Sequence, residues 1–542
     1  MVKAFFQARI GRAGALAIWL SVLVSIRAEP VADGVRAHIE FLADDLLAGR
    51  ATGSPGFALA ANYVAAQFRA AGLEPAGDRG GWQQAIQFLE ATRVPEGAVA
   101  RLERGGVTET LKYGEDYVAD PVWFGEKAEV TAPLLFVGYG VHAPDSGYDD
   151  FAGVDLTGKI AVVLSGAPPT LPHDERAYYT KTTVKYAELA RCHAVGVVTV
   201  LTPEDDARVP WAIRINGTRF SAMRLVDETS RPLDVFPELK VGITLQREAA
   251  ARWLGGGPRP LAEIFAAAKL GKPQAFALPG TATLVAQSTF RRVASANVLG
   301  RLAGSDPKLR EEVVVVTAHL DHIGIGPAIN GDNIYNGRYD NATGTAILIE
   351  AARLLAGGPR PRRTVLFAAL TGEEKGLLGG VHLARHPVVP REKVAANVNV
   401  DMPMFLGAAR DVIAWGAEHS TLGKVVERVG RAHGLALGPD PAPEEVIFVR
   451  SDQYPFVEAG VPAIYLDPGE TPVDPAMKLH ELNAEFRRLH YHRPSDDLSL
   501  PFDHAAAAHF TRFIADVVRG VTDEPQRPQW NKGDFFGARF AP

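Results

Sequence analysis

The sequence predicts an α/β protein built on a doubly wound, mostly parallel sheet. After residue 285, strand-like apolar runs alternate with helical patterns, which is typical of parallel βαβ units. The run Val313–Val316 is short, β-branched and bounded by polar residues, as in a strand covered on both faces. Acidic and imidazole side chains recur just past such strands. Open α/β sheets bind their ligands at that edge.

The N-terminal elements are predicted to be helical. Apolar residues at Val35, Ile39 and Leu42 recur at helical spacing, and a glycine-containing loop follows at residues 49–56. A second amphipathic helix is predicted from about residue 60 to Gly72.

The texture changes near residue 128. Strand-like runs at 132–138, 159–164 and 196–201 are separated by long polar loops, and no His/Asp/Glu cluster accompanies them. We interpret residues 128–275 as an inserted, β-rich domain. The alternative is a continuation of the main sheet.

The remaining elements alternate in type. The predicted strands are 295–302, 312–318, 363–370, 395–400 and 461–466, and the predicted helices are 342–355, 377–385, 420–433 and 503–519. The tail from Thr522 is predicted to be irregular. The expected organisation is a signal peptide (1–28), an N-terminal part of the main domain (29–127), the insert (128–275), the main domain (276–520) and a tail (521–542).

Composition limits the function classes. The chain has 542 residues and a formal net charge of −6, which gives no electrostatic case for binding nucleic acid or an anionic membrane. Residues 1–28 combine three early basic residues with the apolar run 13–26, which is the pattern of a secretory signal. An uncleaved anchor is the alternative. We expect an exported protein, and its single cysteine, Cys192, excludes an internal disulfide.

Ligand-type side chains follow several predicted strands. His319 and Asp321 follow the valine run, and the aspartate can share its crevice or hold the imidazole from behind. Asp340 precedes a helix, where a carboxylate is often only a cap. The pair Glu373-Glu374 near a helix start is often surface charge.

Two further residues complete the set. Asp401 directly ends a buried strand, where a carboxylate is costly unless it is paired or ligated. His492 lies in an extended segment with His490 as a rival two residues away.

Each of these signals is weak alone, but together they indicate a metal centre. Two imidazoles and three carboxylates are the mix that hard and borderline divalent ions take. Five such ligands suit two ions sharing a bridging carboxylate. The set is His319, Asp340, Glu374, Asp401 and His492. Glu373 then remains free beside the site, as a general base would.

The motifs resemble those of a known family. The blocks HLDHIG (319–324), GRYDNATG (337–344), TGEEKGLLG (371–379), NVDM (399–402) and YHRPSDD (491–497) are similar to those of the co-catalytic zinc aminopeptidases, a family with the zinc exopeptidase fold that also includes glutamate carboxypeptidases and transferrin receptors. The inserted block 128–275 resembles a protease-associated domain, most clearly in YDDFAGVDLTGKIAVVLSG (148–166). The stretches LADDLLAGRATGSPG (42–56) and SDQYPFVEAGVPAIYL (451–466) also match the family.

The resemblance implies a role for each residue. One zinc would take His319, Asp340 and Asp401, and a second would take Asp340, Glu374 and His492, so that two Zn²⁺ share Asp340. Glu373 would be the general base, and Asp321 would orient His319. The family position favours His492 over His490. Gln453 departs from the pattern, because many relatives place histidine there.

The implied function is removal of N-terminal residues from peptide substrates. A carboxypeptidase acting on acidic C-termini, with Arg450 as the candidate contact, or a glutaminyl cyclase is the alternative within the same class. A receptor-like protein without activity is the other alternative, although such relatives lose ligands. The sequence predicts no oligomeric state.

Overall fold

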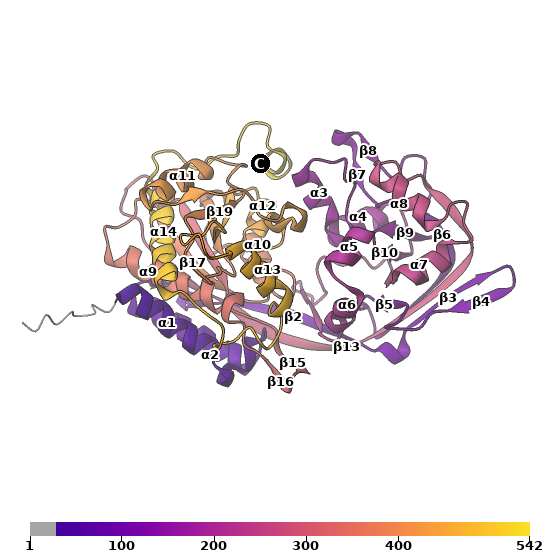
Figure 1. Cartoon of the computed structure of the whole chain (residues 1–542), viewed down its shortest axis with the longest axis horizontal. Helices are drawn as coiled ribbons and strands as arrows, with labels where there is room; N and C mark the ends of the chain where they lie inside the picture. Colours follow the sequence, from indigo (N-terminus) through magenta and orange to yellow (C-terminus); the bar gives the residue numbers. More distant parts are fainter. Residues whose placement is uncertain (1–28, 542) are drawn as a thin grey trace, which may run out of the picture.

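The computed structural model describes residues 29–541, which form two lobes side by side (Figure 1). The predicted signal segment lies outside these residues and stays a prediction. No helix within the described range is both long enough and apolar enough to cross a bilayer.

The first lobe is organised around β14 (Val313–His319), whose seven residues are all buried. It lies between β17 (Thr364–Leu370) and β18 (Val394–Val400), and both pairings are parallel. On the far side of β18, β21 (Ala463–Pro468) pairs in parallel as well. The flanking strands are β13 (Phe276–Leu302) on β17, β2 (Gln83–Arg93) on β13, and β19 (Asp411–Trp415) on β21, all antiparallel. The predicted mostly parallel sheet is confirmed.

Helices cover both faces of this sheet. Alternate residues of its central strand, β14, point to opposite faces, so each face has its own apolar core. Val314 and Val316 contribute to one apolar core, whereas Val313 and Val315 contribute to another. The helices of the first core are α1 (Pro30–Leu42), α2 (Pro55–Ala70), α9 (Gly344–Gly357), α11 (Leu422–Ala432) and α14 (His504–Asp523). Those of the second core are α10 (Leu378–Arg385) and α12 (Tyr454–Glu458). The sheet is therefore doubly wound.

The second lobe is a smaller α/β unit, drawn in magenta in Figure 1. Its parallel strands are β6 (Lys127–Phe136), β9 (Ile160–Leu164), β10 (Gly196–Val200) and β12 (Val241–Leu245). Its antiparallel strands are β3 (Val99–Arg104), β4 (Val107–Thr110) and β5 (Tyr117–Ala119). Its helices are α3 (His173–Thr180), α4 (Thr182–Arg191), α5 (Pro203–Arg208), α6 (Trp211–Thr218), α7 (Arg247–Leu254) and α8 (Leu261–Lys269).

Strand pairing crosses the predicted insert boundaries at 128 and 275. β3 and β5 precede residue 128 but pair with strands of the second lobe, and the 27-residue β13 begins there and ends in the first lobe. Conversely β11 (Ala222–Leu225), inside the predicted insert, pairs with β2 of the first lobe. The division into domains stays a prediction, and the strands place the change of lobe near residues 94 and 288.

The C-terminal tail is irregular from residue 524 to 534, as the sequence predicts, but its two ends are helical. α14 continues to Asp523, and α15 (Phe535–Phe540) follows. Phe536 is fully buried, and Arg539 lies over the ring of Tyr178 of the second lobe, 4.3 Å from its centroid. Aromatic burial, which the proline-rich composition masked, orders this tail between the lobes.

Candidate metal centre

The parallel register of the first lobe brings the predicted residues to one edge. His319 is the last residue of β14 and lies opposite Leu370, the last residue of β17, so the loop carrying Glu373 and Glu374 starts beside it. Asp401 follows directly on β18. All three strands are buried along their length and run parallel to one another, so their carboxyl ends lie at the same edge of the sheet.

Asp340 is positioned by the segment that leads into α9. Its backbone N–H and that of Tyr339 donate to the two carboxylate oxygens of Asp496, at 3.1 and 3.0 Å. The side-chain amide of Asn341 donates to the carbonyl of Val400, 3.1 Å away. These bonds tie the segment to the end of β18 and fix the Asp340 carboxylate at the sheet edge.

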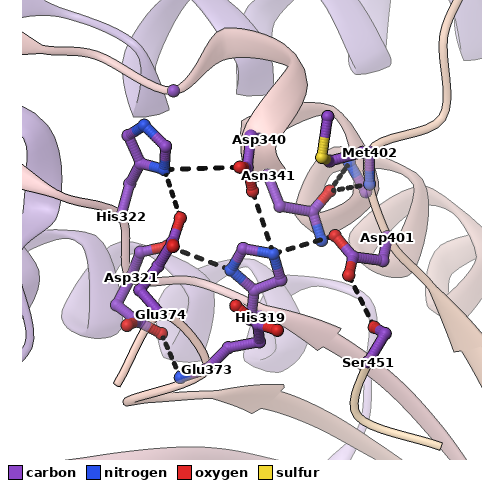
Figure 2. A network of polar contacts seen from close by, with 12 residues as sticks. His319, Asp321, His322, Asp340, Asn341, Glu373, Glu374, Asp401, Met402 and Ser451 are labelled. Atoms are coloured by element: carbon purple, nitrogen blue, oxygen red, sulfur yellow. Dashed lines mark hydrogen bonds and ion pairs between the residues drawn. The ribbon is translucent and has the colours of Figure 1, made fainter. Parts of the chain in front are cut away.

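One group of ligand atoms gathers around His319 (Figure 2). Its Nε2 lies 2.9 Å from Asp401 Oδ1 and 3.2 Å from Asp340 Oδ1. Its Nδ1 donates to the backbone carbonyl of Asp321, 3.1 Å away. A donor bond from Nδ1 leaves Nε2 as the atom with a lone pair facing the two carboxylates.

A second group gathers at the other oxygen of the same aspartate. His492 Nε2 lies 3.2 Å from Asp340 Oδ2 and 3.0 Å from Glu374 Oε2. The two oxygens of Asp340 therefore face two different groups, each with its own imidazole and further carboxylate. The five residues predicted from the sequence are all within these two groups.

The sequence analysis missed a third imidazole. His322 Nδ1 lies 2.6 Å from Glu374 Oε1 and 3.8 Å from Asp340 Oδ2, and its side chain is fully buried. His322 lies three residues after His319 in the same motif. The sequence signal that could have revealed it was the second histidine of the block HLDHIG.

Asp321 contacts the site differently from the prediction. Its carbonyl, and not its carboxylate, accepts from His319, as Figure 2 shows. The carboxylate accepts from Thr52 Oγ1 at 2.9 Å and from the backbone N–H of Glu373 at 3.2 Å. The side chain thus braces the loop of Glu373, while the backbone orients the histidine.

Within residues 29–541, the carboxyl group of Glu373 is unpaired, and its pKa is raised. Its carboxylate makes no hydrogen bond or ion pair with any described residue. Burial raises its pKa well above the ordinary value, and the neighbouring carboxylates of Asp401 and Glu374 add to this against the opposing effect of His319. Such a group is suited to accept a proton at neutral pH.

The donor set fits divalent metal ions. No lysine or arginine among residues 29–541 forms an ion pair with Asp340, Glu374 or Asp401; their ion-pair partners are histidines. Arg50 is buried nearby, but its guanidinium donates to backbone carbonyls such as Leu320 O and Gly337 O. Carboxylates buried without compensating cations call for a bound cation, and the mixed N and O atoms suit zinc.

Residues that competed in the sequence analysis lie elsewhere. His490 Nδ1 contacts Ser495 Oγ at 2.9 Å, outside both groups. Gln453 is buried. Its side chain accepts a hydrogen bond from Asn399 Nδ2 and donates one to Phe448 O, so it joins β18 to the segment around Phe448. Arg450 pairs with Glu445 at 2.7 Å.

Comparison with known proteins shows what the segment that carries this site is similar to. Residues 297–518 match the model of peptidase family M28. A probable zinc metalloprotease of Pyrenophora tritici-repentis is 35% identical over 131 residues, which are 23% of this chain and 26% of that protein. The aminopeptidase YwaD of Bacillus subtilis is 26% identical over 361 residues, 65% of this chain and 61% of its own length.

A solved structure extends the likeness of the fold to both lobes. The aminopeptidase from Aneurinibacillus sp. strain AM-1 has a TM-score of 0.53 at 18% identity, covering 92% of this chain and 95% of that one. The segment that matches the family model, residues 297–518, contains the histidines and carboxylates of both groups: His319, His322, Asp340, Glu374, Asp401 and His492. Residues 297–518 are thus similar to peptidase family M28, and the chain spans about a quarter of the length of the probable zinc metalloprotease that it matches.

Proposed function

We propose that this protein is a dinuclear zinc exopeptidase that removes N-terminal residues from peptides. The observation that carries the proposal is the placement of Asp340, whose two carboxylate oxygens face two separate groups of ligand atoms. His319 and Asp401 would complete one position, and Glu374 and His492 the other.

A bound zinc pair would supply Lewis acidity, polarising the scissile carbonyl and making water more acidic. Glu373 would accept the proton of the attacking water at its carboxylate and deliver it to the leaving amine. Its raised pKa favours holding that proton between the two events.

Neighbouring contacts would keep these groups oriented. The carboxylate of Asp321 fixes the backbone of Glu373, and Ser451 Oγ donates to Asp401 Oδ2 at 2.5 Å. Holding the second oxygen of Asp401 leaves its Oδ1 directed at His319. Partners of this kind tune a ligand without binding the metal themselves.

The aminopeptidase assignment is preferred to the carboxypeptidase alternative. A carboxypeptidase needs a free cation for the substrate carboxylate, and Arg450 is already paired with Glu445. The aminopeptidases named above supply the direct analogy. The retained ligand set speaks against a receptor-like protein. Export remains part of the proposal and depends on residues 1–28.

The test is a screen of peptides with free and with blocked N-termini, with and without a chelator. We expect cleavage of the free peptides only, its loss on chelation and its recovery with zinc. Elemental analysis of zinc-replete protein should give close to two zinc per chain. Cleavage of blocked peptides, or no more than one zinc per chain, would overturn the proposal.

A further inference from the structure

We propose that His322 is a fourth protein ligand at the second metal position, beside Asp340, Glu374 and His492. This inference rests on the proposed function and deepens it, because it makes the two positions unequal. The second position would have two imidazoles and two carboxylates, and the first position one imidazole and two carboxylates.

The distances fit four ligands around one ion. Zinc bonds to nitrogen and oxygen are about 2.0–2.1 Å long, so tetrahedral ligand atoms lie about 3.3 Å from one another. His322 Nδ1 lies 2.6 Å from Glu374 Oε1 and 3.8 Å from Asp340 Oδ2. His492 Nε2 lies 3.0 Å from Glu374 Oε2, the other oxygen of that carboxylate, and 3.2 Å from Asp340 Oδ2. These separations lie on both sides of the tetrahedral value. The ring centroids of the two histidines are 5.8 Å apart, so the rings approach from different directions.

The backbone holds the His322 ring in place. Its N–H donates to Arg50 O at 3.3 Å, and Ala51 and His322 form an isolated parallel bridge. The ring lies against Gly337, where a Cβ atom would come within 2.5 Å of His322 Cγ. Gly337 also has a φ of +61°, a conformation that favours glycine. The chain thus leaves a slot that fits this imidazole.

The state of the other ring nitrogen, Nε2, supports Nδ1 of His322 as the metal-ligating atom. His322 Nε2 is buried without a hydrogen-bond partner among the described residues. Leaving a buried polar atom unpartnered costs about as much as one hydrogen bond gains. A lone hydrogen bond from Nδ1 to Glu374 would therefore bring little net stabilisation, whereas a metal bond at Nδ1 would offset the cost.

The consequence is a division of labour between the two ions. A position with four protein ligands is closed, as in structural zinc sites, whereas three ligands leave room for water or substrate. We expect the second position to fill first and to retain its zinc, and the first position to exchange. Water activation would then belong to the first position, beside Glu373.

Two substitutions separate a ligand from a hydrogen-bond donor. In His322→Asn, an amide N–H can still reach Glu374, but an amide is a poor zinc ligand, whereas His322→Ala removes both interactions. Zinc affinity would be measured by competition with a chromophoric chelator. We expect both variants to lose at least about tenfold in affinity at the tight position. His490→Asn, near the site but outside it, is the matched control and should not change the affinity.

Retention of tight binding in His322→Asn, with loss only in His322→Ala, would reduce His322 to a hydrogen-bond donor and overturn the inference. Unchanged binding in both variants would overturn it too. If both variants fail to fold, X-ray absorption of the unaltered protein decides. Loaded with one equivalent of zinc, it should show two imidazoles on the ion, and one imidazole would contradict the inference. A protein that binds only one zinc in total would instead refute the dinuclear proposal.

Discussion

The two lobes place similar parallel strands at two edges but equip those edges very differently. In the second lobe, β9 is buried along its whole length and β10 at all but one residue, and Ser165 and Thr202 lie just past their carboxyl ends. There the Ser165 hydroxyl accepts from the N–H of Thr202 at 2.9 Å, and the Lys185 ammonium donates to Leu164 O at 3.0 Å.

The difference lies in charge compensation. At the second edge, the carboxylate of Asp205 is paired with Arg208 at 2.9 Å. At the first edge, carboxylates are buried with histidines as their only ion-pair partners among the described residues. Strand burial creates an edge in both lobes, but only uncompensated carboxylates create a cation site. Function belongs to the side chains placed on the fold.

The largest effect should follow from removing the shared carboxylate. Asp340→Asn is expected to lose at least one zinc per chain and about 10⁴-fold in kcat/KM, because metal polarisation contributes several kcal/mol. Asp205→Asn is the matched substitution at the second edge and should leave the zinc content unchanged. Elemental analysis and kinetics of both variants make the comparison. Equal zinc loss in both would show that the two edges do not differ as described.

The second prediction separates the base from the ligands. If Glu373 is the proposed base, Glu373→Gln should keep the bound zinc and reduce turnover on the order of 10²–10⁴-fold, since its carboxylate would then move a proton and hold no metal. Zinc content and kcat should be measured on the same preparation. Loss of zinc would make Glu373 a ligand, and full activity would move the base elsewhere.

The sequence predicted those parts of the site that repeat a local pattern. Val313–Val316 indicated the central strand, and ligand-type residues at the ends of successive strands indicated the centre. The proposed role of His322 was not predicted, because it depends on the space beside Gly337, a residue that lies next to the imidazole only in the folded chain. The carbonyl contact of Asp321 escaped for a similar reason, because sequence patterns do not distinguish a backbone oxygen from a carboxylate.

The boundary between the lobes could not be found from composition. β13 runs without interruption from one lobe into the other, so no turn or linker marks the change. β11 returns to the first lobe in mid-insert, and its Met223 and Leu225 pack with Phe88 in a small apolar core. Long-range pairing of this kind leaves no local signal.

The smallest effect concerns what the second lobe does for the first. A cavity of about 520 Å³ lies where the lobes meet, lined by residues including Thr52, Arg219, Ser221 and Lys375. Lys375 follows Glu374 directly, and its ammonium donates to Ser221 O at 3.1 Å. The second lobe therefore borders the loop that carries the proposed base, and we expect it to limit access by longer peptides.

A deletion that joins residue 127 to 276 would remove β12, which is the partner of β5, and nearly all of β6, which pairs with the first half of β13. A better excision removes residues 95–287. Arg93 and Ser288 are register partners, and the N–H of Val94 donates to Gln287 O at 3.0 Å, so a short Asn-Gly turn can close the β2–β13 hairpin. The product loses β11 and is expected to be less stable. It should still bind zinc, because every proposed ligand lies in the first lobe.

The measurement compares kcat/KM for a dipeptide anilide and for a longer peptide in the full chain and in the excised one. If the second lobe screens substrates, the ratio should move several-fold toward the longer peptide. An unchanged ratio, in an excised protein with full zinc content, would leave the lobe a passive module for stability or partner binding. A fall in both rates together would report a disturbed Lys375 loop, because the loss of the Ser221 contact acts on every substrate alike.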